Sequence, residues 1–166
     1  MSDRLRLGIV GTGAVTQLVH LPLSSGRNDV EVVALADKDP EKARALADRF
    51  HVPLVLATDD LLGHEGLDAV IICTPNHLHE SEAIAGLAAG KHVLVERPLA
   101  LTPDGCQRVV AAARSANRIL EVGMSHRFRP DVAALRAFVA GGELGRLYAG
   151  RVALSLIHIS EPTRPY

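Results

Sequence analysis

Two glycines near the N-terminus, Gly11 and Gly13, have the spacing that brings a backbone close to a phosphate group. They follow the apolar run Leu5–Val10 and precede residues 14–23, which can continue as a helix. In this context Gly11 permits a tight turn, and Gly13 lets the backbone approach a pyrophosphate at the N–H groups of the helix start. Thr16 occupies the position of the third glycine in the usual pattern. A small residue can replace glycine there, although the helix then packs less closely against the strand. The stretch predicts a dinucleotide-binding turn.

Asp37 is the second candidate ligand, about 20 residues beyond the glycine turn. It ends the segment Val30–Ala36, whose nearly continuous apolar character is typical of a buried parallel strand. A carboxylate there accepts hydrogen bonds from the adenosine ribose and repels a 2′-phosphate, which favours NAD as the cofactor. NADP is the alternative, because Lys38 offsets part of that repulsion. Asp37 could also be an ordinary turn residue before Asp39 and Pro40.

Alternating apolar and amphipathic segments would position these residues. The expected strands are 5–10, 30–36, 52–56, 68–73, 92–95 and 119–123, and one more begins at 151–153. The expected helices are 14–23, 40–50, 58–62, 80–89, 103–116 and 131–140. Thr58 to Asp60 and Thr102 are candidate N-cap positions for two of these helices. Such alternation predicts the α/β fold class, as a doubly wound parallel sheet.

Composition excludes several classes of protein. The 166 residues are 48% hydrophobic and 22% charged, which suits a packed domain of ordinary size. A net charge of −1 indicates neither a nucleic-acid partner nor a membrane surface. We expect no signal peptide, no membrane-spanning segment and two reduced thiols, Cys73 and Cys106, in a cytoplasmic protein. His77 and His79 would not share a helix face and lack a third ligand, so no metal site is expected.

Four stretches together resemble one family: GIVGTGAV with His20, ALADKDPEKA, DAVIICTPNHLHESEAIAGLAAGKHVLVERPLALT, and VGMSHRFRP. Residues 5 to 150 are similar to the glucose-fructose oxidoreductase, inositol dehydrogenase and rhizopine catabolism (Gfo/Idh/MocA) family. The resemblance implies a nicotinamide-binding Rossmann domain, followed by an α/β domain that supplies most of the substrate pocket and the oligomer interface. It implies a sugar or polyol as the small-molecule substrate, oxidised at a hydroxyl or reduced at the matching ketone, and a homo-oligomeric parent protein.

The resemblance also assigns roles to individual residues. The phosphate loop falls on Gly11, Gly13, Ala14 and Val15, and the ribose acid falls on Asp37. Thr74, Pro75 and Asn76 would line the nicotinamide half of the cofactor, with His79 beside them. The family's Glu-Lys-Pro motif falls on Glu96, Arg97 and Pro98. Arg127 matches an arginine near the cofactor and the substrate.

Arg97 departs from the family pattern. The family's lysine is thought to hydrogen-bond the reacting hydroxyl and to assist proton movement. Arginine stays charged and does not exchange a proton, although it can polarise an oxygen or orient a substrate, so Arg97 is the catalytic candidate in that restricted sense. Lys91 precedes its strand and lies at the wrong end of the sheet to replace it. Three functions stay open: an NAD(P)-dependent dehydrogenase, a non-catalytic dinucleotide-binding or regulatory protein, and an NAD-dependent glycoside hydrolase branch of the family.

The domain boundaries follow from the same resemblance. We expect a dinucleotide-binding domain over 1–123 and the truncated start of a second domain over 124–153. Residues 154–166, LSLIHISEPTRPY, look like a reading frame through a transposase-based sequencing adapter, and we expect them to make few contacts. His158 lies in this tail and does not stand for the family's further catalytic histidine. On this interpretation the chain is a fragment without turnover of its own.

Overall fold

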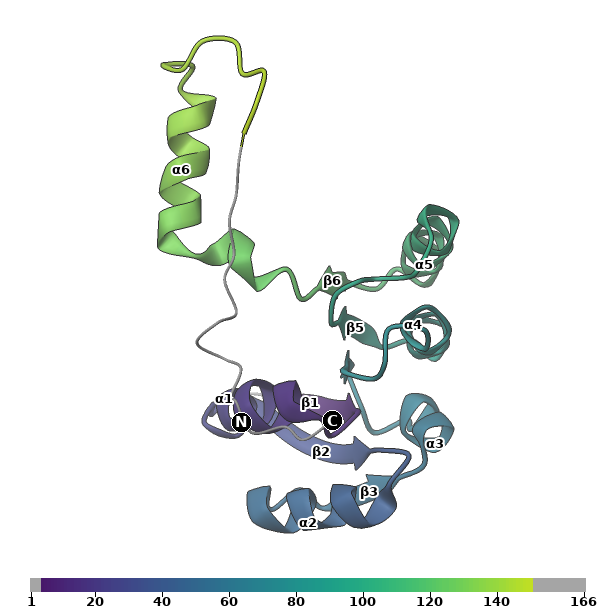
Figure 1. Cartoon of the computed structure of the whole chain (residues 1–166). Coiled ribbons are helices and arrows are strands. Elements are labelled where there is room, and N and C mark those ends of the chain that lie inside the picture. The colour runs from purple at the N-terminus through teal and green to yellow at the C-terminus, as the bar shows by residue number, and fades with distance from the viewer. Residues whose placement is uncertain (1–3, 151–166) are drawn as a thin grey trace, which may run out of the picture. The chain divides into compact units, whose positions relative to one another are not determined.

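The computed structural model describes residues 4–150 (Figure 1). The chain divides into two compact units, one ending at Met124 and the other beginning at Ser125. The predicted strand at 151–153 and the tail at 154–166 lie outside the described residues. The division of the chain into domains that the sequence suggested stays a prediction.

The first unit is built on one parallel sheet of six strands. The strands are β1 (Leu5–Val10), β2 (Val30–Ala36), β3 (Leu54–Leu56), β4 (Ala69–Ile72), β5 (His92–Val95) and β6 (Leu120–Val122). Their order across the sheet is β3-β2-β1-β4-β5-β6, and every pair is parallel. This order confirms the doubly wound Rossmann fold, with its switch point between β1 and β4.

Strand register aligns the carboxyl ends. Val10 pairs with Ala36 on one side and with Ile72 on the other, and Ile72 pairs in turn with Val95. The next residues along these four strands, Gly11, Asp37, Cys73 and Glu96, therefore all emerge at one edge of the sheet. This is the edge at which open α/β sheets bind their ligands.

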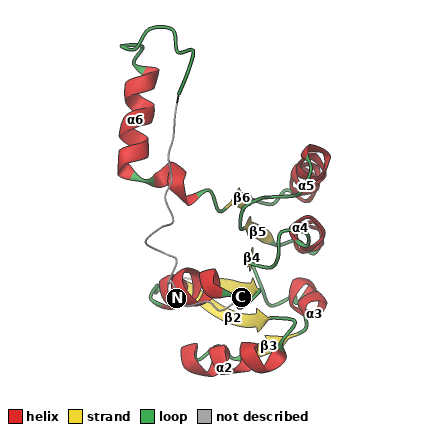
Figure 2. Cartoon of the chain, viewed as in Figure 1, coloured by secondary structure: helices red, strands yellow, loops and turns green. Residues whose placement is uncertain are grey.

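Helices cover both faces of the sheet, as Figure 2 shows. On one side are α3 (Thr58–Gly63), α4 (His79–Ala88) and α5 (Pro103–Ala116). On the other are the π-helical turn η1 (Thr16–His20), α1 (Leu21–Ser25) and α2 (Pro40–Phe50). Each face has its own apolar core, because neighbouring residues of a strand point to opposite sides. Val10, Ile72 and Val95 belong to the first core, and Ile9 and Ile71 belong to the second.

Caps and turns follow local chemistry at most helix ends. Thr102 caps α5 as expected, because its Oγ1 accepts a hydrogen bond of 3.0 Å from the Gly105 N–H. Asp39 caps α2 by accepting from the Lys42 N–H at 3.2 Å. Beyond α4, Gly90 has a φ of +78°, a conformation that glycine adopts without a steric penalty.

Three expectations differ from the structure by more than a shift of one residue at the end of an element. The helix expected over 14–23 becomes π-helical over Thr16–His20 and runs on to Ser25, and Pro22 has no N–H for an α-helical bond. The strand expected over 52–56 begins only at Leu54, because Pro53 cannot donate to a strand ladder. Thr58 is the first residue of α3 and not its cap, since the N-cap is Ala57, whose side chain makes no bond.

The second unit contains the 3-10 turn η2 (Ser125–Phe128) and α6 (Pro130–Ala140). None of the residues of α6 is buried, and Phe128 keeps 76% of its surface exposed. Across residues 4–150, no helix is both long enough and apolar enough to cross a membrane.

Candidate dinucleotide-binding site

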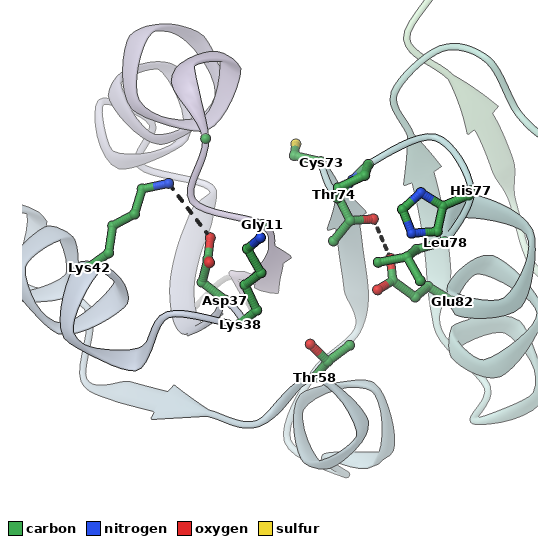
Figure 3. A pocket seen from close by; sticks show the side chains of 12 residues that line it. Gly11, Asp37, Lys38, Lys42, Thr58, Cys73, Thr74, His77, Leu78 and Glu82 are labelled. Atoms are coloured by element: carbon green, nitrogen blue, oxygen red, sulfur yellow. Dashed lines mark hydrogen bonds and ion pairs between the residues drawn. The ribbon is translucent and has the colours of Figure 1, made fainter.

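A cavity of about 400 Å³ lies at the carboxyl ends of the central strands. Figure 3 shows it from close by, with residues that follow β1 and β2 on one wall and residues that follow β4 on the other. Its lining residues are Gly11, Gly13, Asp37, Lys38, Lys42, Thr58, Cys73, Thr74, Pro75, His77, Leu78 and Glu82. The glycine turn, Asp37 and the Thr74-Pro75 segment are thus brought together as the sequence predicted.

The two glycines of the turn differ in what surrounds them. Gly11 has a φ of +90°, and a Cβ built on it would lie 2.6 Å from the Cys73 carbonyl oxygen. A side chain at Gly11 would therefore push β1 away from β4. A Cβ on Gly13 would meet nothing within 4 Å, so the space above this residue is open. Thr16, in the third glycine position, is buried and donates from Oγ1 to the Gly11 carbonyl at 2.6 Å, which ties the turn to the helix.

The carboxylate of Asp37 is held against the glycine turn. The backbone N–H and the Oγ1 hydroxyl of Thr12 both donate to its Oδ2, each at 2.6 Å, and the Asp39 N–H donates to Oδ1 at 3.1 Å. The Lys42 ammonium lies 3.9 Å from Oδ2. Burial raises the pKa of Asp37, but the Thr12 and Asp39 hydrogen bonds and the Lys42 charge outweigh it, so the pKa of Asp37 is lowered. Asp37 therefore presents an ionised acceptor to the cavity.

Thr12 was missed by the sequence analysis. It is fully buried, and it joins the first strand's turn to the second strand's carboxylate over a separation of 25 residues. In the sequence, Thr12 is visible only as a hydroxyl residue between the two glycines. Hydroxyl residues are common in turns, so this pattern alone does not identify Thr12 as a site residue.

His79 lies beside the Thr74-Pro75 segment and is buried. It is 1% exposed and does not line the cavity. Its Nδ1 lies 2.6 Å from the Pro98 carbonyl oxygen, and its Nε2 lies 2.8 Å from the Thr74 carbonyl oxygen. A neutral ring donates to one of these oxygens and an imidazolium donates to both. His79 thus joins the loop after β4 to the loop after β5 and positions the Thr74-Pro75 segment.

At the end of β5, Glu96 pairs with His20. The His20 Nε2 lies 2.9 Å from the Glu96 Oε1, and both side chains are largely buried. Gly123 makes room for this carboxylate, because a Cβ there would lie 2.9 Å from the Glu96 Oε2. The pair joins the helical turn after β1 to the strand end of β5.

Cys73 borders the cavity as a protonated thiol. Burial raises its pKa to about 11, against a hydrogen bond with Thr16 that lowers it, and the Glu96 charge raises it further. A thiol in this state is a poor nucleophile. Cys73 and Cys106 are both free cysteines.

The remaining predicted site residues are less constrained. Arg97 is exposed, and none of the hydrogen bonds or ion pairs found among residues 4–150 involves its side chain. Ala14 and Asn76 are also exposed and, like Val15, are not cavity-lining residues. Arg127 belongs to η2 in the second unit. The described part of the chain holds no group of three or more His, Cys, Asp or Glu side chains suited to a metal ion.

The strand order, the glycine turn against β4 and the carboxylate after β2 together define a dinucleotide-binding Rossmann domain. Residues 5–124 match the oxidoreductase family with an NAD-binding Rossmann fold known as Gfo/Idh/MocA. The chain belongs to this family, as the sequence motifs predicted, and the open space at Gly13 and the acceptor at Asp37 fit an NAD-type dinucleotide.

Curated relatives include D-glucoside 3-dehydrogenase of Escherichia coli (strain K12), 36% identical over 150 residues, which are 89% of this chain and 42% of that protein. Inositol 2-dehydrogenase 1 of Saccharopolyspora erythraea is 36% identical over 144 residues, which are 85% of this chain and 43% of that protein. A 3-ketoreductase from Actinomadura kijaniata, solved in complex with NADP, superposes with a TM-score of 0.78 at 27% identity. That match covers 86% of this chain and 46% of the other. The chain thus spans less than half the length of these relatives.

Proposed function

We propose that this chain is the cofactor-binding part of an NAD(P)-dependent dehydrogenase that acts on a sugar or polyol hydroxyl. The observation that carries the proposal is one cavity that combines open backbone at Gly13 with the ionised carboxylate of Asp37. A pyrophosphate needs the first feature and a ribose needs the second. The substrate class is supported by relatives named for activity on inositol and on glucosides.

The proposed roles follow the order of the strand ends. Gly11 shapes the turn, while Gly13, Ala14 and Val15 face the pyrophosphate and Asp37 accepts from the ribose. Asn76 and Glu96 line the nicotinamide half, Thr74 and Pro75 border the cavity beside Asp37, and His79 positions the loop that contains Thr74. The bound nicotinamide would supply hydride chemistry. Arg97 would orient or polarise a substrate oxygen, because a guanidinium does not release its proton at neutral pH.

A second candidate function is dinucleotide binding without catalysis, as in a regulatory protein. Arg97 favours it, because this residue occupies the position where the family's proton-handling lysine is expected. The glycoside hydrolase branch of the family would need the same cofactor site. We further propose that the parent protein is cytoplasmic and assembles as a homo-oligomer, in line with two free thiols and the family resemblance.

Isothermal titration of the full 166-residue chain with NAD tests the shared core of these functions. We expect saturable binding that weakens by about tenfold or more in Asp37→Ala, because a charged hydrogen bond to the ribose is lost. Asp48→Ala, at an exposed position of α2, is the matched control and should bind as the unchanged chain does. Absence of saturable binding to a folded chain would overturn the proposal.

A further inference from the structure

Glu82 is a buried carboxylate that neither the fold nor the roles above explain. It lies near the start of α4, is 8% exposed and lines the same cavity as Asp37. Its Oε2 accepts a hydrogen bond of 2.5 Å from the Thr74 Oγ1. None of the ion pairs found in residues 4–150 includes Glu82. The other carboxylate oxygen, Oε1, has no partner among residues 4–150, and since no buried side-chain nitrogen or oxygen there lacks a partner, Oε1 is accessible and can accept from a ligand.

The cavity places Glu82 opposite the proposed ribose site. In Figure 3, Asp37 and Lys38 form one wall, Thr74 and Glu82 form the other, and Thr58 lies between the two walls. Leu78 and Pro75 add apolar surface on the side of Glu82. A base attached to a ribose held by Asp37 would enter this same space, since about 400 Å³ lies between the walls.

The chemistry of the lining selects among bases. Apolar side chains pack against the flat face of any base, but a carboxylate oxygen accepts only from a donor. Adenine carries a 6-amino group with two N–H donors, whereas hypoxanthine and guanine carry a carbonyl oxygen at the same position. A carbonyl facing an ionised Glu82 would place two acceptors together.

We propose that Glu82 recognises the 6-amino group of the adenine base through the carboxylate oxygen that Thr74 leaves free. This inference rests on the proposed function, because it assumes that Asp37 holds the ribose. Burial raises the pKa of Glu82, and the nearby Asp59 charge adds to this, although the Thr74 hydrogen bond and His79 and His77 act against it. An N–H donor from the amino group would favour the ionised carboxylate and offset part of this effect of burial.

The test compares NAD with nicotinamide hypoxanthine dinucleotide, which differs at the 6-position, by isothermal titration of the full chain. The unchanged chain should bind NAD about tenfold or more tightly than the hypoxanthine analogue, as sites built around a substrate N–H do. Glu82→Leu, which keeps the volume and removes the acceptor, should bring that ratio below about threefold. Glu82→Gln should also lower the ratio, because its amide nitrogen can turn to face the 6-oxygen. Glu31→Gln, at an exposed position of β2, is the control and should leave the ratio unchanged.

The outcomes separate this inference from the proposed function. Equal affinity of the unchanged chain for the two dinucleotides would overturn the role of Glu82 while leaving NAD binding intact. A ratio that survives in Glu82→Leu would overturn it as well. Binding of neither dinucleotide would overturn the proposed function and this inference with it. Thermal unfolding of each variant shows whether it folds. If Glu82→Leu does not fold, the test rests on the ratio of NAD affinity to hypoxanthine-analogue affinity, measured in the unchanged chain and in Glu82→Gln.

Discussion

At the scale of single residues, Asp37 and Lys42 act in opposite directions on cofactor choice. The Asp37 carboxylate repels a 2′-phosphate, while the Lys42 ammonium, 3.9 Å away, would attract one. We expect the chain to bind NAD more tightly than NADP, by on the order of tenfold. Asp37→Ser should reverse the order, and Lys42→Met should weaken NADP binding further while leaving NAD binding nearly unchanged. Titration with both cofactors measures these ratios.

Arg44→Met serves as the control for Lys42→Met, because it removes a cation from an exposed position of the same helix. It should change neither affinity by more than about twofold, since exposed charges act weakly at a distance. Tighter binding of NADP than of NAD by the unchanged chain would contradict the role given to Asp37.

Glu82 should also make folding stability depend on pH. Its pKa is raised in the folded state from the value of 4.5 expected for an exposed glutamate, so the folded chain holds this proton more tightly than the unfolded chain does. The contribution of the protonated group to stability is complete below pH 4.5 and is lost as the pH rises through the folded pKa. Glu82→Gln stays neutral at every pH. Its stability relative to the unchanged chain should therefore increase as the pH is raised from 4.5 to about 8.

Urea unfolding at a series of pH values measures this gain. Glu31→Gln is again the control, because its exposed side chain should give a difference in unfolding free energy that does not vary with pH. A constant difference between Glu82→Gln and the unchanged chain over the same range would contradict an ionisable, desolvated Glu82.

At the scale of elements, the turn between β1 and the first helix contains one glycine for the fold and one for the ligand. Gly11→Ala should cost about 2 kcal/mol or more of stability, because it forces a side chain into a positive φ and against the Cys73 carbonyl. Gly13→Ala should leave stability within about 1 kcal/mol, because nothing in the chain lies near its Cβ. Its methyl group would occupy the space proposed for the pyrophosphate, so NAD affinity should fall by about tenfold or more.

Chemical unfolding and NAD titration of the same variants separate the two roles. Gly63→Ala is the control, since its Cβ would also meet no atom within 4 Å and it lies at the end of α3, outside the cavity lining. It should keep full NAD affinity. Normal NAD affinity in a folded Gly13→Ala would mean that no phosphate approaches this turn.

At the scale of the whole molecule, we expect the 166-residue chain to bind cofactor without sustained turnover. Hydride transfer needs the nicotinamide, the substrate carbon and a proton acceptor in one geometry, and positioning alone contributes about 7–11 kcal/mol. The first unit supplies the cofactor side of this arrangement, and Arg97 does not accept a proton. The chain also spans only 42% of the length of the D-glucoside 3-dehydrogenase that it matches.

Absorbance of NADH during incubation with NAD and a panel of polyols, sugars and glucosides measures turnover. The inositol 2-dehydrogenase of Saccharopolyspora erythraea, assayed with inositol, is the positive control. Sustained NADH production that depends on the purified chain would contradict the expectation. It would mean that a residue of the chain other than Arg97 accepts the proton.

Local chemistry in the sequence was enough to predict most of the fold and part of the cavity. Helix α5 and strands β1, β2 and β5 have the predicted bounds, because apolar periodicity and turn residues act over a few neighbours. The position of Asp37 across from Gly11 was predicted for a similar reason, since parallel strands bring their carboxyl ends to one edge. The bounds of β3 and the path of the first helix were wrong where Pro53 and Pro22 remove backbone donors.

Only the tertiary structure decided which polar groups meet. Thr12 reaches Asp37 over 25 residues, His79 reaches Pro98 over 19, and His20 reaches Glu96 over 76. Glu82 looks in the sequence like any polar residue on a helix, yet packing of α4 against the sheet buries it at the cavity. Periodicity states which face of an element is apolar, whereas a hydrogen bond needs two atoms placed within about 3 Å. That placement comes from the packing of whole helices on the sheet, which no local stretch of sequence contains.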